Sequence, residues 1–326
     1  MSDTVFLISD IRAKDVKQEP IRAGFGRGLL AAGQQNENVV AACADLTDST
    51  KMNLFAEAFP ERFLNVGVAE QNLVTVGAGL AATGKIPFVS SYAAFSPGRN
   101  WEQIRTTICL NDRPVKVVGS HAGVSVGPDG ATHQMLEDLA LMRALPNMVV
   151  IAPADSVEAE KATLAMAADK RPNYMRLARE ATPVFTTTKT PFQIGKAYVF
   201  REGTDVTIVA TGTMTYQALV AAEILQKDGI SAEVVHAPTV KPLDEKTILA
   251  SAHKTRAVIT AEEAQINGGL GGAVAELLGE QLPTPLKRIG MRDRFGESGE
   301  PNELLEHFGL TGTHIALAAH DLLGKR

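Results

Sequence analysis

Short apolar runs alternate with longer, helix-like stretches from about Ile21 onward. The runs contain four or five residues and are largely apolar on both faces, as buried parallel strands are. In the first half of the chain they are residues 39–43, 63–66, 87–90, 115–119, 148–152 and 173–177. This alternation predicts a parallel sheet that is covered by helices on both faces.

One helix start is marked by its polar residues. Asp155 lies where an N-cap is expected, and Glu158 follows three residues later, which is the spacing of a capping box. We therefore predict that a helix begins here with a capping box.

The alternation stops at residues 181–194, where threonine and proline recur without a helical period. We interpret this stretch as a linker between two domains. A second alternation follows, with strand-like runs at 205–212, 231–238 and 256–263 and helix-like stretches at 219–229 and 268–282. The pattern predicts an α/β chain with two doubly wound domains, residues 1–185 and the smaller 186–326, which agrees with a length of 326 residues.

Charge and composition narrow the classes of partner. A net charge of −5 and a pI near 5.9 give no reason to expect nucleic acid or a membrane surface as a partner. No apolar run approaches the about eighteen residues of a membrane span, and the N-terminal run of four apolar residues is too short for a signal peptide. Cys43 and Cys109 form neither a CxxC motif nor a zinc spacing, so we expect two reduced, buried thiols in a cytoplasmic protein.

Two stretches with unusual side chains follow predicted strands, at the edge where open α/β sheets bind ligands. In residues 65–72, NVGVAEQN, Glu70 falls in the first turn of a predicted helix, where the helix dipole alone also favours a glutamate. In residues 90–101, SSYAAFSPGRNW, Tyr92 and Phe95 stand three positions apart. These two rings are consistent either with a ligand-facing pair or with core packing.

A third stretch, residues 120–134, follows the strand predicted at 115–119 and combines glycines with His121, Asp129 and His133. Glycine-rich loops can turn backbone N–H groups toward an anion, and histidines can hold a phosphate or move protons. The two histidines have no obvious third ligand nearby in the sequence, so no metal site is predicted in this chain.

Arg22 and Arg179 are further candidates for binding an anion. Arg22 opens the first predicted helix, and Arg179 follows the last strand of the first domain. An isolated arginine usually lies on the solvated surface, so these two positions need further support.

Taken in order, four stretches resemble successive blocks of the pyrimidine-binding domain of the transketolase family. They are residues 45–50, 65–72, 90–95 and 120–147. The block GPDGATHQ is specific, whereas GVAEQ is shared by several thiamine enzymes. The resemblance runs from about Arg22 to the C-terminus, and it implies a pyrimidine-binding domain followed by a transketolase C-terminal domain.

The resemblance implies thiamine diphosphate as the cofactor. Glu70 matches the carboxyl group that hydrogen-bonds N1′ of the aminopyrimidine and thereby promotes loss of the proton from the thiazolium C2. Tyr92 and Phe95 match the aromatic pair that packs on the aminopyrimidine, although Tyr92 stands where phenylalanine is common. Asp45 and Leu46 match residues that lie against the cofactor.

The resemblance also implies how a sugar phosphate is bound. The positions that match its phosphate-binding residues are Arg22, Ser49, His121 and Arg179. Asp129 matches an aspartate that contacts the hydroxyl groups of the donor, and His133 matches a histidine near the reacting carbon. Glu70, His121 and His133 are thus the implied catalytic residues.

The chain has no GDG motif, which marks the transketolase domain that binds the diphosphate through Mg²⁺ or Ca²⁺. The resemblance therefore implies a split transketolase whose N-terminal partner subunit carries that domain, with two such pairs assembled as α2β2. The implied reaction is that of the pentose phosphate pathway. It transfers a two-carbon ketol unit from a ketose phosphate, such as xylulose 5-phosphate, to an aldose phosphate, such as ribose 5-phosphate.

Four alternatives stay open on the sequence alone. 1-Deoxyxylulose-5-phosphate synthase shares the AEQ and DG–THQ blocks but typically has arginine in place of His121. The β subunit of 2-oxo-acid dehydrogenases has this length and domain pair but does not carry GPDGATHQ. The other two are a split transketolase for apiose-derived or sulfonated sugars and a degenerate member that binds a partner without turnover.

Overall fold

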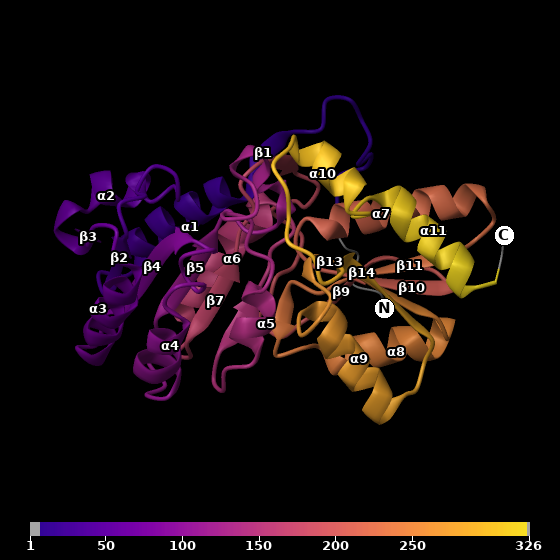
Figure 1. Cartoon of the computed structure of the whole chain (residues 1–326). Coiled ribbons are helices and arrows are strands. Elements are labelled where there is room, and N and C mark those ends of the chain that lie inside the picture. Colours follow the sequence, from indigo (N-terminus) through magenta and orange to yellow (C-terminus); the bar gives the residue numbers. More distant parts are fainter. Residues whose placement is uncertain (1–6, 325–326) are drawn as a thin grey trace.

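Seven strands form the larger sheet of the computed structural model, which describes residues 7–324 (Figure 1). The strands are β2 (Val39–Cys43), β3 (Phe63–Asn65), β4 (Ile86–Tyr92), β5 (Lys116–Ser120), β6 (Val149–Ile151), β7 (Asn173–Arg176) and β12 (Thr239–Lys241). Their order in the sheet is β12-β6-β7-β5-β4-β2-β3. The first six lie at the six predicted runs and pair in parallel, which confirms this part of the pattern.

Helices cover both faces of this sheet, as predicted. They are α1 (Ile21–Gln35), α2 (Asn53–Ala58), α3 (Glu70–Ala82), α4 (Trp101–Gln103), α5 (Asp138–Arg143) and α6 (Ser156–Ala168), with shorter 3₁₀ or π turns at Pro60–Arg62, Ile104–Cys109 and Val124–Asp129. Successive side chains of a strand point to opposite faces. Phe88 of β4 therefore packs in one apolar cluster with Phe25 of α1, whereas Val89 packs in another with Leu73 of α3.

A second, five-stranded sheet lies in the C-terminal half. It contains β9 (Tyr198–Arg201), β10 (Val206–Ala210), β11 (Ala232–His236), β13 (Val258–Gln265) and β14 (Leu286–Met291). Its order is β14-β13-β10-β11-β9, and only β9 pairs antiparallel to its neighbour. The helices of this half are α7 (Met214–Lys227), α8 (Glu245–Thr255), α9 (Leu270–Gln281), α10 (Pro301–His307) and α11 (Gly312–Leu322). The sequence pattern did not predict β9, β12, β14, α8, α10 or α11.

The start of the predicted linker is held by hydrogen bonds to the first domain. β8 (Ala181–Pro183) pairs antiparallel with β1 (Gln18–Pro20). The backbone N–H groups of Phe185 and Thr186 donate to Oδ2 of Asp155 at 2.9 and 2.7 Å. The start of the predicted linker is therefore tied to the first domain and is not a free connection. We propose that the domain boundary lies after Phe185.

Asp155 caps α6, as predicted, because its Oδ1 accepts hydrogen bonds from the N–H groups of Val157 and Glu158 at 3.1 and 3.0 Å. Glu158, however, does not close a capping box. Its Oε2 accepts a hydrogen bond from the N–H of Ala154 and lies 2.7 Å from Nε2 of His236 on β11. The capping-box prediction is therefore wrong, because the Glu158 carboxylate binds the N–H of Ala154 and the buried His236 of the second domain instead of the N–H of Asp155.

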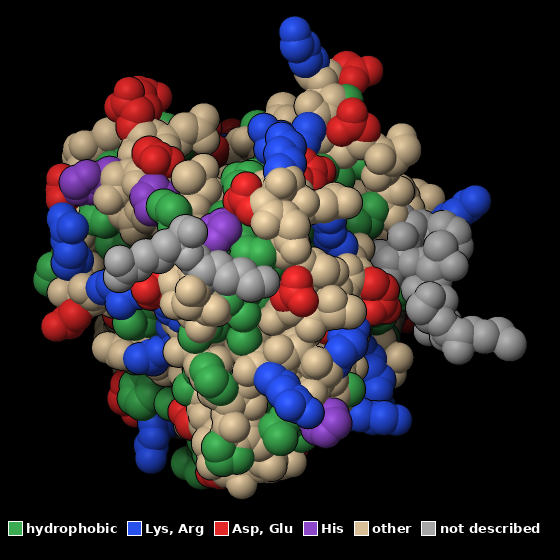
Figure 2. All heavy atoms as spheres, turned by 90° about the vertical axis from the view of Figure 1, so that its right-hand side faces the viewer, with side chains coloured by type: hydrophobic (Ala, Val, Ile, Leu, Met, Phe, Trp, Pro, Cys, Tyr) green, Lys and Arg blue, Asp and Glu red, His purple; other side chains and the backbone are tan. Residues whose placement is uncertain are grey.

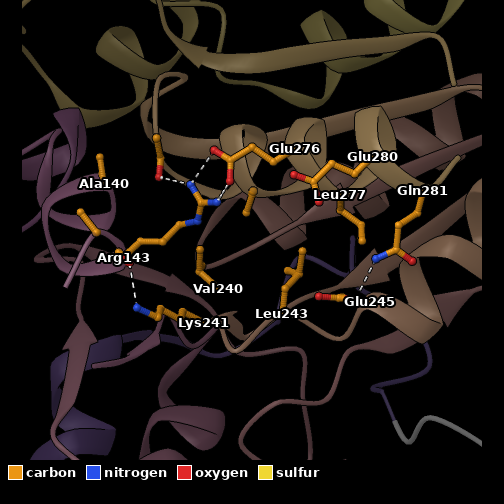
Figure 3. A pocket seen from close by; sticks show the side chains of 13 residues that line it. Ala140, Arg143, Val240, Lys241, Leu243, Glu245, Glu276, Leu277, Glu280 and Gln281 are labelled. Atoms are coloured by element: carbon orange, nitrogen blue, oxygen red, sulfur yellow. Dashed lines mark hydrogen bonds and ion pairs between the residues drawn. The ribbon is translucent and has the colours of Figure 1, made fainter. Parts of the chain in front are cut away.

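The two halves of the chain meet around a cavity of about 550 Å³ between α5, β12, α8 and α9 (Figure 3). Arg143 of α5 donates to Oε1 of Glu276 on α9 at 3.1 Å, and Lys241 of β12 donates to the main-chain oxygen of Arg143 at 3.0 Å. β12 pairs antiparallel with β6, so a strand of the second half completes the first sheet. The predicted site residues all lie in the described part of the chain, and none of them lines this cavity.

Basic and acidic side chains are interspersed over the face shown in Figure 2, which is the right-hand side of Figure 1. Within residues 7–324, the structure contains no helix of the length and apolar character needed to cross a membrane. The apolar N-terminal run that we considered as a targeting segment begins in residues 1–6, which lie outside the described residues.

Candidate active site

The predicted site residues converge at one edge of the seven-stranded sheet, because parallel strands present their carboxyl ends at the same edge. They are Asp45 after β2, Glu70 after β3, Tyr92 at the end of β4, His121 after β5 and Arg179 after β7. Arg22 joins them from the start of α1, where its Nε donates to the main-chain oxygen of Arg179 at 3.2 Å. The sheet therefore assembles residues that are far apart in the sequence.

Glu70 is the first residue of α3, and its side chain is only 2% exposed. Nη1 of Arg99 donates to Oε2 of Glu70 at 2.7 Å, so the buried carboxylate has a charged partner. The same guanidinium lies 4.7 Å from the centre of the Phe95 ring. Nδ2 of Asn100 donates to the main-chain oxygen of Glu70 at 2.8 Å. Arg99 and Asn100 were not predicted as site residues, although both lie in the stretch 90–101.

The aromatic pair and the two histidines form one cluster. The rings of Tyr92 and His121 are stacked with their centroids 3.8 Å apart, and those of Tyr92 and Phe95 are 6.1 Å apart. The His133 ring lies edge-on to Phe95 at 5.4 Å. The structure thus brings together the four rings that the sequence placed in two separate stretches.

The environment of His121 keeps its imidazole neutral. The residue has a φ of 59°, in the left-handed region, and its Nδ1 lies 2.8 Å from Oγ of Ser120. Burial lowers the pKa of His121 to about 3, with further lowering by the charges of Arg22, Arg179 and His133. Near pH 7 this side chain can therefore exchange hydrogen bonds with a ligand but carries no positive charge.

The two arginines lie beside Ser49 and Asp129. Nη1 of Arg22 donates to the main-chain oxygen of Ser49 at 2.5 Å. Nη1 of Arg179 donates to the main-chain oxygen of Val126 at 2.7 Å and lies 3.9 Å from Oδ2 of Asp129. Because a guanidinium carries five N–H donors, each arginine keeps further donors for an anionic ligand. These contacts bring together four of the five predicted substrate residues, with two guanidinium groups near one carboxylate.

Asp45 and Leu46 lie where β2 ends. Asp45 has a φ of 59°, and its Oδ1 accepts a hydrogen bond from Nδ2 of Asn65 at 3.1 Å. Oδ1 of Asn65 in turn accepts hydrogen bonds from the N–H groups of Asp45 and Gly67 at 3.1 and 3.0 Å. This pair of side chains links the ends of β2 and β3, while Leu46 is half-buried beside it.

The described residues offer neither a metal-binding cluster nor a reactive thiol at this site. Residues 7–324 contain no group of three or more His, Cys, Asp or Glu side chains placed to hold a metal ion. Cys43 and Cys109 are buried free thiols, as predicted. Burial raises the pKa of Cys109 to about 12, so that thiol is not poised to act as a nucleophile.

Two family models match the chain. The model described as the pyrimidine-binding domain of transketolase matches residues 17–184, and the model described as the transketolase C-terminal domain matches residues 195–315. The chain belongs to the transketolase family. The predicted family and fold class are thereby confirmed.

Proteins of similar sequence and structure share this part of the transketolase family. A Methanocaldococcus jannaschii protein that is named provisionally as a transketolase C-terminal section is 48% identical over 299 residues, which cover 91% of this chain and 94% of that protein. The 6-deoxy-6-sulfo-D-fructose transketolase subunit of a Clostridium species is 45% identical over 298 residues, or 91% of this chain and 92% of that subunit. A solved structure described as a split-gene transketolase, inactive beta4 tetramer, superposes with a TM-score of 0.88 and 46% identity over 94% of this chain and 99% of that one.

A transketolase pyrimidine-binding domain implies thiamine diphosphate as its cofactor. The residues present fit the aminopyrimidine end of that molecule. Glu70 supplies a buried carboxylate, and Arg99 bridges it to the ring of Phe95, which lies beside Tyr92. An aminopyrimidine needs both a carboxyl partner and flat apolar surfaces, and this edge of the sheet offers them together.

Proposed function

We propose that this chain is the C-terminal subunit of a thiamine diphosphate-dependent transketolase. The enzyme reversibly transfers a two-carbon ketol unit from a ketose phosphate, such as xylulose 5-phosphate, to an aldose phosphate, such as ribose 5-phosphate. The observation that carries the proposal is the buried carboxylate of Glu70, which lies at the same sheet edge as the Tyr92–His121 stack and the two arginines.

Glu70 is the residue that sets the protonation of the cofactor. Thiamine diphosphate, when bound, supplies the carbanion chemistry of the reaction at its thiazolium ring. Glu70 holds the hydrogen bond to N1′ of the aminopyrimidine, and its burial keeps water from competing for that bond. Tyr92 and Phe95 pack against the ring, and Asp45 and Leu46 contact the cofactor from the end of β2.

Arg22 and Arg179 bind the phosphate of the sugar, together with Ser49 and His121. Two guanidinium groups suit a phosphate dianion because each can donate paired hydrogen bonds to its oxygens. His121 adds a hydrogen bond without a further charge, since its pKa is lowered to about 3.

Asp129 and His133 act on the reacting end of the sugar. Asp129 orients the hydroxyl groups of the donor from a position 3.9 Å from the guanidinium of Arg179. His133, whose Nδ1 lies 2.9 Å from Oγ1 of Thr132, exchanges protons with the reacting carbonyl, and the neutral His121 supports this step through hydrogen bonds. Both histidines lie on one loop, so a single movement of that loop changes the position of both.

The chain needs an N-terminal partner subunit that binds the diphosphate through Mg²⁺ or Ca²⁺, and two such pairs form an α2β2 assembly in the cytoplasm. Support comes from the surface beside Glu70, where apolar Val68 is 73% exposed and Leu64 is 42% exposed. Exposed apolar side chains next to a site are typical of a surface that another subunit covers. The similar solved chain, described as an inactive beta4 tetramer, also supports a need for the partner.

A sulfonated sugar is the second candidate substrate. A relative with 45% identity is a 6-deoxy-6-sulfo-D-fructose transketolase subunit, and a sulfonate, like a phosphate, presents anionic oxygens to the two arginines. Parallel assays with xylulose 5-phosphate and with 6-deoxy-6-sulfofructose as donor distinguish the two substrates by their kcat/KM values.

The proposed function is tested by reconstitution. Ketol transfer from xylulose 5-phosphate to ribose 5-phosphate is measured with Mg²⁺ and thiamine diphosphate, first with this chain alone and then with the partner recovered by co-purification. The proposal predicts transfer only in the mixture. Transfer by the chain alone contradicts the need for a partner. The absence of transfer from either donor in the mixture contradicts the transketolase assignment.

A further inference from the structure

We propose that Glu263 of the second domain is a positioning residue for the histidine loop, which we define as residues 120–134. The inference rests on the proposed function, because this loop carries His121, Asp129 and His133. It adds a role for the second domain, which contributes none of the site residues described above.

The carboxylate of Glu263 joins the histidine loop to the second domain. Glu263 lies near the end of β13, and its side chain is 4% exposed. Its Oε1 accepts a hydrogen bond from the backbone N–H of Ser125 at 2.7 Å, and its Oε2 accepts one from Oγ1 of Thr213 at 2.9 Å. Ser125 lies midway between His121 and Asp129 in the sequence, so the carboxylate holds the loop between two substrate residues.

The backbone of the loop is shaped to approach this carboxylate. Gly123 has a φ of 93°, and a Cβ atom built on it would lie 2.2 Å from Oε1 of Glu263. A side chain there would displace the carboxylate from Ser125, and the positive φ would be strained in any residue other than glycine. The absence of a side chain at Gly123 therefore leaves the space in which the Glu263 carboxylate binds Ser125.

The residue that follows Ser125 contacts Arg179, one of the two arginines proposed to bind the phosphate. The main-chain oxygen of Val126, the residue after Ser125, accepts a hydrogen bond from Nη1 of Arg179 at 2.7 Å. A carboxylate bound to a buried N–H group is a charge-assisted hydrogen bond, and it is stronger than a neutral one. Loss of the Glu263 carboxylate therefore frees the turn that orients Arg179 as well as the loop itself.

The main chain of Glu263 is itself held firmly. Its main-chain oxygen accepts a hydrogen bond from Nη2 of Arg176 at 2.6 Å, and Nε of Arg176 lies 3.1 Å from Oδ2 of Asp138. All three residues are buried. The carboxylate thus projects toward the loop from a fixed point at the junction of the domains, as a positioning residue requires.

The neighbouring Glu262 offers a matched control. It is also buried, but its carboxylate accepts hydrogen bonds from the N–H groups of Leu270 and Gly271 at 2.8 and 2.7 Å, at the start of α9. Glu262→Ala therefore removes a buried carboxylate of the same domain without removing a contact of the histidine loop.

Hydrogen exchange on the isolated chain tests the contact without any need for activity. In Glu263→Ala, the amides of residues 121–134 are expected to exchange roughly tenfold faster or more, while Glu262→Ala leaves them at the rate of the unmodified chain. Glu263→Gln keeps a carbonyl acceptor for Ser125 and is expected to exchange at a rate close to that of the unmodified chain. Unchanged exchange of the loop in a folded Glu263→Ala chain would overturn the proposal.

Kinetics of the reconstituted enzyme separate positioning from mere stability. Glu263→Ala is expected to raise the KM for the ketose phosphate about tenfold, with the half-saturating concentration of thiamine diphosphate unchanged. Glu263→Gln is expected to restore the KM to within about twofold of its original value, which a purely structural defect does not predict. An unchanged KM with a lower yield of folded protein, in both Glu263→Ala and Glu262→Ala, overturns the positioning role.

A milder variant covers the case in which Glu263→Ala does not fold. Thr213→Val removes the hydrogen bond to Oε2 but keeps the bond from Ser125 to Oε1. It is expected to change exchange and KM in the same direction by about twofold to threefold. No change in either measurement contradicts the proposal. Because the exchange experiment needs neither partner nor substrate, it can succeed even if the transketolase assignment fails.

Discussion

Glu70 and Arg99 form an ion pair in which Nη1 of the arginine lies 2.7 Å from Oε2 of the carboxylate. The carboxylate is buried, whereas the arginine side chain is 50% exposed. The pair therefore holds a negative charge at the candidate cofactor site by means of a cation that reaches it from the surface. Because Arg99 binds Oε2, a ligand at this site must share the carboxylate with the arginine or replace it.

Removal of Arg99 is expected to destabilise the chain through Glu70. The variant Arg99→Met leaves the buried carboxylate without its charged partner, at a cost of about 1 kcal/mol because the arginine is half exposed. Urea denaturation of Arg99→Met, Glu70→Gln and the double variant gives the coupling energy of the two side chains. A coupling energy close to zero would show that the ion pair contributes nothing to stability.

His121 is expected to make the chain less stable in mild acid. Its pKa is about 3 in the folded chain, whereas an unfolded histidine titrates near 6.5. The unfolded state thus binds the proton first, so the contribution of His121 to stability is complete above about pH 6.5 and is lost as the pH falls toward 3. Between pH 7 and pH 5 the unfolding free energy of the parent chain should decrease by on the order of 1–2 kcal/mol more than that of His121→Asn.

The control for this experiment is a histidine outside the site. His253 is exposed on α8, so His253→Asn should keep the full acid sensitivity of the parent chain. Equal acid sensitivity of the parent chain and His121→Asn, measured by urea denaturation at both pH values, contradicts the neutral, buried state of His121.

Arg179 is expected to act on the sugar substrate and not on the cofactor. Its guanidinium lies beside Asp129 and is held on Val126, where it can meet an anionic sugar. In the reconstituted enzyme, Arg179→Ala should raise the KM for the ketose phosphate by about tenfold to a hundredfold, because a charged hydrogen bond is lost. Initial rates at varied donor and varied thiamine diphosphate separate the two effects.

Arg201→Ala is a suitable comparison for Arg179→Ala. Arg201 lies on β9 and bonds Gln226, so its removal should leave both half-saturating concentrations unchanged. If Arg179→Ala instead shifts only the concentration of thiamine diphosphate that is needed, the assignment of the arginine to the sugar is wrong.

The sequence predicts those features that depend on local pattern. The run at residues 39–43 coincides with β2, because a short apolar run that contains β-branched residues favours a buried strand. The edge of the sheet that carries Glu70, Tyr92 and His121 followed from strand order and from the resemblance to a known family. Those predictions needed no knowledge of distant contacts.

Features that depend on distant contacts could not be predicted. Arg99 was overlooked because nothing in its neighbourhood in the sequence shows that it meets Glu70, 29 positions earlier. Glu263 was overlooked for the same reason, since its partner Ser125 lies 138 positions away. The capping-box spacing at Glu158 gave a wrong prediction because His236, a buried residue of the second domain, binds that carboxylate.

The central claim, that Glu70 sets the protonation of the cofactor, is tested most directly by transfer activity of Glu70→Ala in the reconstituted enzyme. Glu57→Ala, exposed on α2, serves as the control for loss of a glutamate. We predict a loss of at least about a hundredfold in kcat for Glu70→Ala, with a normally assembled complex, and no loss for Glu57→Ala. A folded, assembled Glu70→Ala enzyme with the kcat of the parent would contradict the account.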